Sequence, residues 1–141
     1  MTLDRDTVVV RLAMMNDLLR DLESIGWVDS LRLRSDRIAR HAVERILTQL
    51  VEFAVSINSH VAASVSGSVP GIYRDSFRAA ADAGFITADL AERLAPSAGL
   101  RNVLTHEYVE VDLDLVAAGA GAALVDYRAY VRAVARAVQG Q

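Results

Sequence analysis

The chain has 141 residues, with 18 acidic and 15 basic side chains and a formal net charge of −3. A 52% share of hydrophobic residues excludes a disordered chain, and the absence of cysteine excludes disulfides, thiolate metal sites and cysteine nucleophiles. The first residues lack a secretory signal, and no apolar run reaches the roughly 20 residues that cross a bilayer. We therefore expect residues 1–141 to form a single helical domain, without membrane association, in the cytoplasm.

The first predicted helix begins near Asp6 or Thr7, either of which can cap it, and runs to about Ser24 before Gly26. Apolar residues recur along it at intervals of three and four, which places them on one face. These are Val8, Leu12, Met15, Leu19 and Leu22.

A second, longer helix is predicted to start at Ser35 or Asp36 and to supply the main core stripe. The stripe consists of Ile38, Ala42, Ile46, Leu50, Phe53, Ile57 and Val61. On its other face, Arg40 and Glu44 are close enough to pair across one turn. Residues 65–71 are small and turn-rich, which predicts a loop between antiparallel helices.

A short helix is predicted over residues 73–83, ending at Gly84 in a left-handed cap. Thr87 then caps a helix that bears Leu90, Leu94, Leu100 and Leu104, and we expect Pro96 to kink or restart this helix.

Residues 109–112 alternate in polarity and predict an extended connection, after which Asp112 or Asp114 caps a last helix. Its stripe is Val116, Ala120, Leu124, Tyr127, Val131, Val134 and Val138, and the small residues from Ala117 to Ala123 permit a close helix crossing. The sum is an all-α, up-and-down bundle of four main helices plus a short one.

One segment concentrates reactive side chains: Arg101, Asn102, His106 and Tyr108 fall within eight residues. Arginine offers a planar fork for two phosphate oxygens, and histidine both donates and accepts a proton near neutral pH. The pair is a minimal ribonuclease set that requires no metal and no cofactor. No glycine-rich phosphate loop and no metal-binding histidine spacing occur in the sequence.

Helical geometry constrains this site. At about 100° per residue, Arg101 and His106 lie about 140° apart around a regular helix, whereas Asn102 and His106 nearly align. The two catalytic groups converge only if the helix loosens near His106 or if two chains share one site. A two-fold homodimer satisfies the second condition and brings two imidazoles to one cleft.

The residues alone leave other interpretations open. A histidine beside Leu100 and Leu104 is often a half-buried packing residue, and an arginine-rich helix face is often only solvated. His41 and His60 are interpreted as structural. The acids between residues 102 and 126 repel phosphates, and arginines between residues 30 and 45 compensate for them. The acids are Glu107, Glu110, Asp112, Asp114 and Asp126, and the arginines are Arg32, Arg34, Arg37, Arg40 and Arg45.

The run from Arg101 to Tyr108 resembles the Arg-x4-His-x-Tyr signature of HepT-type toxins in the HEPN superfamily. Its surroundings resemble the family as well, and the likeness extends from about Asp6 to Val138. The similar segments are residues 42–47, the turn at 84–86, residues 99–100 before the arginine and residues 111–112 after the tyrosine.

The resemblance implies a HEPN-like helical bundle that dimerises with its two Arg/His segments in one cleft. It also implies a metal-independent endoribonuclease acting on RNA, including transfer RNA, and an MntA-type minimal nucleotidyltransferase as the antitoxin. By this resemblance Arg101 steadies the scissile phosphate, Asn102 positions its neighbours and His106 transfers the proton. Tyr108 is the residue that the antitoxin modifies with AMP, and the added phosphate repels substrate.

Three interpretations remain at this point. The chain is either a toxin ribonuclease silenced by AMPylation, or a non-catalytic helical module that binds a nucleotidyltransferase or nucleotide through the same cleft. A third interpretation is a purely structural bundle. The intact Arg101 and His106 pair favours cleavage, while the acidic surroundings and the net charge of −3 favour partner binding.

Overall fold

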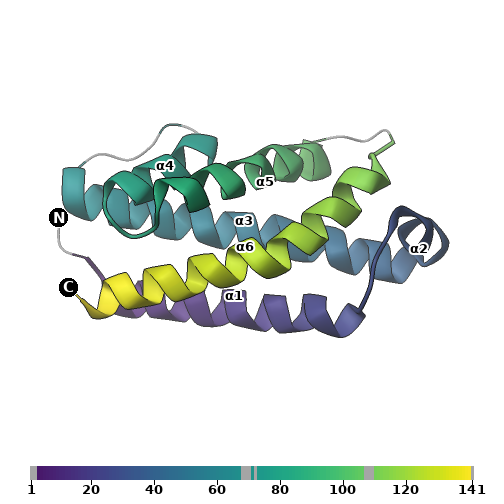
Figure 1. The fold of residues 1–141 in the computed structure, drawn as a ribbon, viewed down its shortest axis with the longest axis horizontal. Coiled ribbons are helices and arrows are strands. Elements are labelled where there is room, and N and C mark those ends of the chain that lie inside the picture. The colour runs from purple at the N-terminus through teal and green to yellow at the C-terminus, as the bar shows by residue number, and fades with distance from the viewer. Residues whose placement is uncertain (1–2, 68–70, 72, 107–109, 141) are drawn as a thin grey trace.

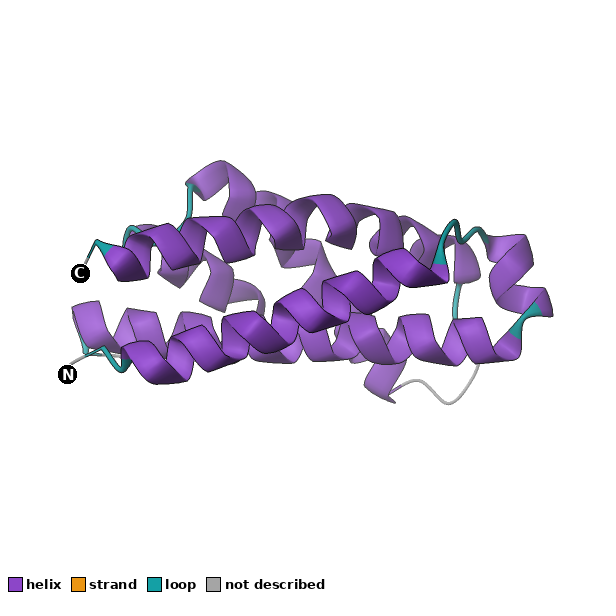
Figure 2. Cartoon of the chain, turned by 90° about the horizontal axis from the view of Figure 1, so that it is seen from below, coloured by secondary structure: helices purple, strands orange, loops and turns teal. Residues whose placement is uncertain are grey.

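The computed structural model describes residues 3–67, 71, 73–106 and 110–140. Within these residues the chain forms six α-helices. They are α1 (Arg5–Ile25), α2 (Ser30–Ser35), α3 (Arg37–Ser66), α4 (Tyr73–Asp82), α5 (Ala88–His106) and α6 (Leu113–Gln139). Figure 1 shows α1, α3, α5 and α6 running along one axis, each opposite in direction to the one before, with both termini at the same end. Figure 2 shows only helices and connecting loops in this part of the chain, which confirms the predicted all-α, up-and-down bundle.

Helix α1 carries the predicted core stripe without change. All five of its stripe residues are buried, and Gly26 ends the helix with φ of 84°. The predicted cap was wrong by two residues or more, because Asp4 is the N-cap and its carboxylate accepts from the Thr7 backbone N–H at 3.2 Å. Aspartate in an extended conformation before a helix satisfies one of the free N–H groups of the first turn.

Helix α3 begins after its predicted cap, Asp36, but its core face is displaced at the N-terminal end. The side chain of Ile38 is 83% exposed, whereas Ala39 and Val43 are buried. A series with steps of four residues drifts by about 40° per step, so Ile38 lies about 120° from Leu50 around the helix. The drift moved only the N-terminal end of the predicted stripe off the core face, and Ile46, Leu50, Ile57 and Val61 are buried as predicted.

Helix α2 was not predicted, because six residues are too few for a periodic signal. Asp29 caps it by accepting from the Arg32 backbone N–H at 2.8 Å, and Leu33 anchors it in the core. Figure 1 shows α2 at the end of the bundle where α3 and α6 begin.

Helix α5 starts as predicted, with the Thr87 hydroxyl accepting from the Leu90 N–H at 3.1 Å after the left-handed Gly84. The expectation that Pro96 restarts the helix was wrong, because α5 continues through it to His106. Pro96 and Glu92 are both exposed, so water can bond the Glu92 carbonyl that proline leaves without a donor.

Helix α6 packs closely against α5 at the predicted stretch of small residues. A Cβ atom added to Gly119 would lie 2.6 Å from Leu100 Cδ2, so a larger residue at this crossing would force the Leu100 side chain to move. Further along α6, the rings of Tyr127, Tyr130 and Phe77 pack edge to face on one another, with centroids 6.1 to 6.5 Å apart. Burial raises the pKa of both tyrosine hydroxyls above the usual value.

Candidate active site on α5

Arg101 is fixed in place by its neighbours. Its side chain is 16% exposed, and its Nε and Nη2 donate to Glu52 Oε1 of α3 at 3.2 and 2.7 Å. Its Nη1 donates to Asn102 Oδ1 at 3.3 Å. The guanidinium therefore has a defined direction within a single chain.

An aromatic platform also supports this guanidinium. The Tyr73 ring of α4 lies 4.8 Å from the Arg101 Cζ atom, in a cation–π arrangement. Ser76 holds the Tyr73 turn by donating to the Tyr73 carbonyl at 2.7 Å, and buried Asn58 donates to Ser76 Oγ at 3.1 Å. Tyr130 of α6 donates to Asn58 Oδ1 at 2.6 Å, which links the platform to the core.

Sequence reasoning missed both Glu52 and Tyr73 as partners of Arg101. Glu52 is one of several charged residues on the outer face of α3, and Tyr73 lies at the start of a short helix. They lie 49 and 28 positions before Arg101, so local spacing gives no sign of the contact. Only the packing of α3, α4 and α5 brings the three together.

His106 occupies a different environment. It is the last residue of α5 and its side chain is exposed. The helix remains regular up to this point, and the Thr105 hydroxyl donates to the Arg101 carbonyl at 3.0 Å. Of the two conditions for convergence, loosening of the helix is therefore not seen within α5, and Arg101 and His106 diverge by about 140°. Tyr108 lies outside the described residues.

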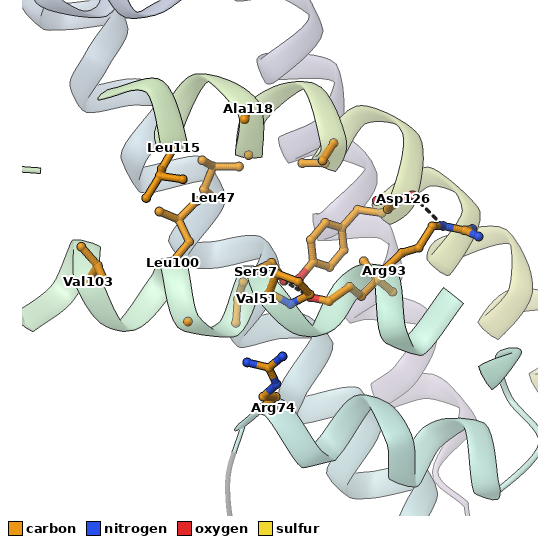
Figure 3. A pocket seen from close by; sticks show the side chains of 17 residues that line it. Leu47, Val51, Arg74, Arg93, Ser97, Leu100, Val103, Leu115, Ala118 and Asp126 are labelled. Carbon is orange, nitrogen blue, oxygen red and sulfur yellow. Dashed lines mark hydrogen bonds and ion pairs between the residues drawn. The ribbon is translucent and has the colours of Figure 1, made fainter. Parts of the chain in front are cut away.

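An apolar groove lies between α5 and α6 beside the Arg101 turn. It has a volume of about 550 Å³ and is lined mainly by aliphatic and small side chains. Figure 3 shows Leu100 of α5 turned toward Leu47 of α3 and Leu115 of α6. Val103 and Leu115 in this lining are 39% and 58% exposed. The groove is thus an apolar surface open to solvent next to the motif.

The predicted arginine cluster divides into paired and free side chains. Arg32 donates to the Ile25 and Trp27 carbonyls, and Arg40 pairs with Glu44 at 3.3 Å as predicted. The remaining three are exposed and form no ion pair with any residue that the structure describes. They are Arg34, Arg37 and Arg45.

The other two histidines differ from each other. His60 Nε2 accepts from the Asp4 backbone N–H at 2.9 Å, which confirms its structural interpretation. His41 is exposed on α3, so burial does not support its structural interpretation. In the described part of the chain no three His, Asp or Glu side chains gather to hold a metal ion. None of the described helices has an apolar stretch long enough for a bilayer crossing.

The bundle and its Arg/His helix define a class of protein. The structure superposes on a tri-AMPylated HEPN toxin of Shewanella oneidensis, solved in complex with an MNT antitoxin, with a TM-score of 0.82 and 24% identity over 93% of this chain and 98% of that one. A Bacillus subtilis cytosolic protein of unknown function, YutE, gives 0.84 at 17% identity over 99% and 94% of the two chains. The fold is that of HEPN toxins.

The sequence comparison gives the family itself. Residues 15–134 match the family Ribonuclease HepT-like, and the chain belongs to it. A tRNA nuclease HepT of Aphanizomenon flos-aquae is 30% identical, over 84% of this chain and 78% of its own. An mRNA nuclease HepT of Shewanella oneidensis is 26% identical, over 79% of this chain and 83% of its own.

Proposed function

We propose that this chain is the toxin of a toxin–antitoxin pair and cleaves RNA without a metal ion. The carrying observation is membership in the Ribonuclease HepT-like family together with Arg101 and His106 on one helix. Relatives named tRNA nuclease and mRNA nuclease support an RNA substrate. We place its activity in the cytoplasm, where such RNA is found, and treat residues 1–141 as one domain.

The proposed chemistry is attack of a ribose 2′-hydroxyl on the adjacent phosphorus. The His106 imidazole of one copy of the chain removes the proton of the attacking hydroxyl. A second, protonated imidazole gives a proton to the departing 5′-oxygen. The phosphorus–5′-oxygen bond breaks as the cyclic phosphate forms. Arg101 stabilises the negative charge that collects on the phosphate oxygens, while Asn102 holds the guanidinium.

The second imidazole belongs to a second copy of the chain. Because α5 is regular up to His106, one chain directs Arg101 toward α3 and His106 toward solvent, so one chain does not assemble the site. A two-fold homodimer places both motifs in one cleft. The apolar groove beside Val103 and Leu115 gives the second copy a surface to cover.

We further propose that an MntA-type nucleotidyltransferase is the antitoxin and adds AMP to Tyr108. The structural relative that is a tri-AMPylated HEPN toxin bound to an MNT antitoxin supports this partner. An adenylate near the site adds a negative charge that repels RNA and competes for Arg101. Modification therefore silences cleavage.

The test is cleavage by the purified, unmodified protein in EDTA. We expect RNA to be cut under these conditions, and we expect the protein co-expressed with the nucleotidyltransferase to carry adenylate at Tyr108 by mass spectrometry and to leave RNA whole. Intact RNA with unmodified protein at low salt would reject the nuclease proposal.

A second candidate is a non-catalytic module that binds a nucleotidyltransferase or nucleotide. One observation favours it. Glu52 already pairs with the Arg101 guanidinium, and in a nuclease this guanidinium must contact the phosphate of the RNA instead. A binding module of this kind would form a stable complex with its partner but would give no cleavage products in the same EDTA assay.

A further inference from the structure

We infer that one face of α3 binds the phosphate backbone of RNA beyond the cleavage site. This face, here called the basic stripe, consists of Arg37, His41 and Arg45. All three side chains are exposed. The inference rests on the proposed function, because it assigns the path of the RNA that leaves the Arg101 site.

The basic stripe is continuous with the contact that holds Arg101. At about 100° per residue, His41 and Arg45 each lie within about 20° of Glu52 around α3. At about 1.5 Å per residue, Arg45 is about 10 Å and His41 about 16 Å along the axis from Glu52. Since Glu52 binds Arg101, the stripe begins, at Arg45, about two turns of α3 from the proposed phosphate site.

The stripe also lies at the correct end of the bundle. Figure 1 shows the start of α3 and the end of α5 at the same end. A strand held at Arg101 and running toward this end of the bundle therefore reaches Arg45 first and Arg37 last. The spacing of about 6 Å between residues four positions apart suits successive phosphates of an extended strand.

The charge of this face is available to a ligand. Arg37 and Arg45 have no ion pair with any described residue, whereas the nearby acids are occupied. Glu44 pairs with Arg40, and the Asp36 carboxylate accepts from the Ala39 N–H at 3.1 Å. The guanidinium groups of Arg37 and Arg45 therefore do not have to leave an ion pair with a described acid in order to bind a phosphate.

Arg101 and Arg93 are held in ion pairs, Arg93 with Asp89 and Asp126, and these two guanidinium groups are less available to an added phosphate than those of the stripe. The basic stripe offsets the acidic residues that follow the motif in sequence. Phosphate contacts of this kind supply affinity and do not read sequence.

A protein surface is the competing interpretation, because exposed Ile38 adjoins the stripe. Charge favours RNA. A protein partner that used Ile38 would have to bring acids against two free arginines, whereas an RNA strand brings a phosphate at every step. Binding of the nucleotidyltransferase to the stripe variant distinguishes the two interpretations.

The experiment uses a non-cleavable probe, a 2′-O-methyl oligoribonucleotide of about 12 residues, with the full-length unmodified protein. Binding is measured by fluorescence anisotropy across a range of salt concentrations for wild type and for Arg37→Gln/Arg45→Gln. The matched control is Arg132→Gln/Arg136→Gln, which removes the same charge from exposed positions of α6 near the opposite end of the bundle.

We expect Arg37→Gln/Arg45→Gln to raise Kd about tenfold near 0.1 M salt and to lower the slope of log K against log salt by about 1.4, at about 0.7 per phosphate. The control leaves Kd within about twofold and the slope unchanged. Light scattering verifies that both variants keep the oligomeric state of the wild type.

Three results would overturn the basic stripe. Equal Kd and slope for both double variants would mean that only net charge matters. If Arg37→Gln/Arg45→Gln bound RNA as tightly as wild type, the stripe would not be an RNA-binding site. Loss of binding to the nucleotidyltransferase with RNA binding retained would make the surface a protein interface. A failure of the proposed function has a different signature: ordinary RNA stays whole with wild type, while the 2′-O-methyl probe still binds through the stripe.

Discussion

The two ends of the motif on α5 differ in how the chain treats them. Arg101 is 16% exposed and is held by Glu52, by Asn102 and by the Tyr73 ring. His106 lies five residues further on, at the last position of the helix, with its side chain exposed. One chain therefore prepares the charge-stabilising half of the site and leaves the proton-transferring half open.

The difference indicates where a second molecule is needed. A positioned guanidinium costs no reorganisation when charge develops on a phosphate, so it benefits from being fixed in advance. Proton transfer needs an imidazole within hydrogen-bond reach of a substrate oxygen, and nothing in the described part of the chain directs His106 toward Arg101. Dimerisation supplies that geometry in our account.

We expect the largest effect on activity from removing the His106 imidazole. We expect His106→Ala to lower kcat for RNA cleavage by about 10²- to 10⁴-fold with an unchanged melting temperature, because the side chain is exposed and general acid–base catalysis contributes on this scale. The control is His60→Ala, which removes an imidazole from the C-terminal part of α3, far from His106. This variant should cleave RNA at the wild-type rate. Cleavage kept by His106→Ala would assign the proton transfer elsewhere.

The next largest effect is expected from a substitution that separates the two copies of the dimer. Val103→Asp places a charge on the exposed lining of the apolar groove, and we expect a monomer by light scattering with cleavage lowered about 100-fold. The folded bundle should survive, since Val103 is already 39% exposed. Val10→Asp on α1, which is also exposed, is the control that should stay dimeric and active. A fully active monomer would contradict the shared site.

The orientation of Arg101 can be weakened without removing Arg101 itself. Glu52→Ala deletes the carboxylate that orients Arg101, and we expect kcat to fall about tenfold with a smaller change in KM. Glu92→Ala changes an exposed acid of α5 and should have no effect on either constant. An increase in kcat would mean that Glu52 restrains Arg101 and does not position it.

The smallest expected effect on activity concerns the support beneath Tyr73. Asn58→Ala leaves the buried Tyr130 hydroxyl with one partner fewer and removes the donor to Ser76, so we expect about 2 kcal/mol less stability by denaturant unfolding. Cleavage at 25 °C should change by less than about threefold, since the bundle remains folded. Asn16→Ala on the exposed face of α1 should unfold like wild type. An unchanged midpoint for Asn58→Ala would show that the network contributes no stability.

Much of the bundle could be predicted because its signals are local. Gly26, Gly84, Thr87 and Asp112 mark helix ends by backbone chemistry that acts over three or four residues. The stripe of α1 was predicted in full for the same reason. The stripe of α3 was predicted less well, because a series of four-residue steps drifts around the helix and carried Ile38 to the surface.

The environment of the motif was not predictable in the same way. The sequence shows Arg101 and His106, but the contacts to Glu52 and Tyr73 join residues that meet only after α3, α4 and α5 have packed. Tyr130 was likewise absent from the predicted stripe of α6, because the buried Asn58 that it bonds lies 72 residues away. Buried polar pairs of this kind are set by three-dimensional packing and leave no periodic trace.

The shared cleft can be tested most directly by cross-linking, because the chain has no cysteine of its own. Asn102→Cys introduces one thiol on the exposed face of α5 that also carries His106, and Arg132→Cys introduces one near the other end of the bundle. With a short bismaleimide, our account predicts covalent dimers of Asn102→Cys and none of Arg132→Cys. Monomers only from Asn102→Cys, in a sample that light scattering shows to be dimeric, would contradict the account.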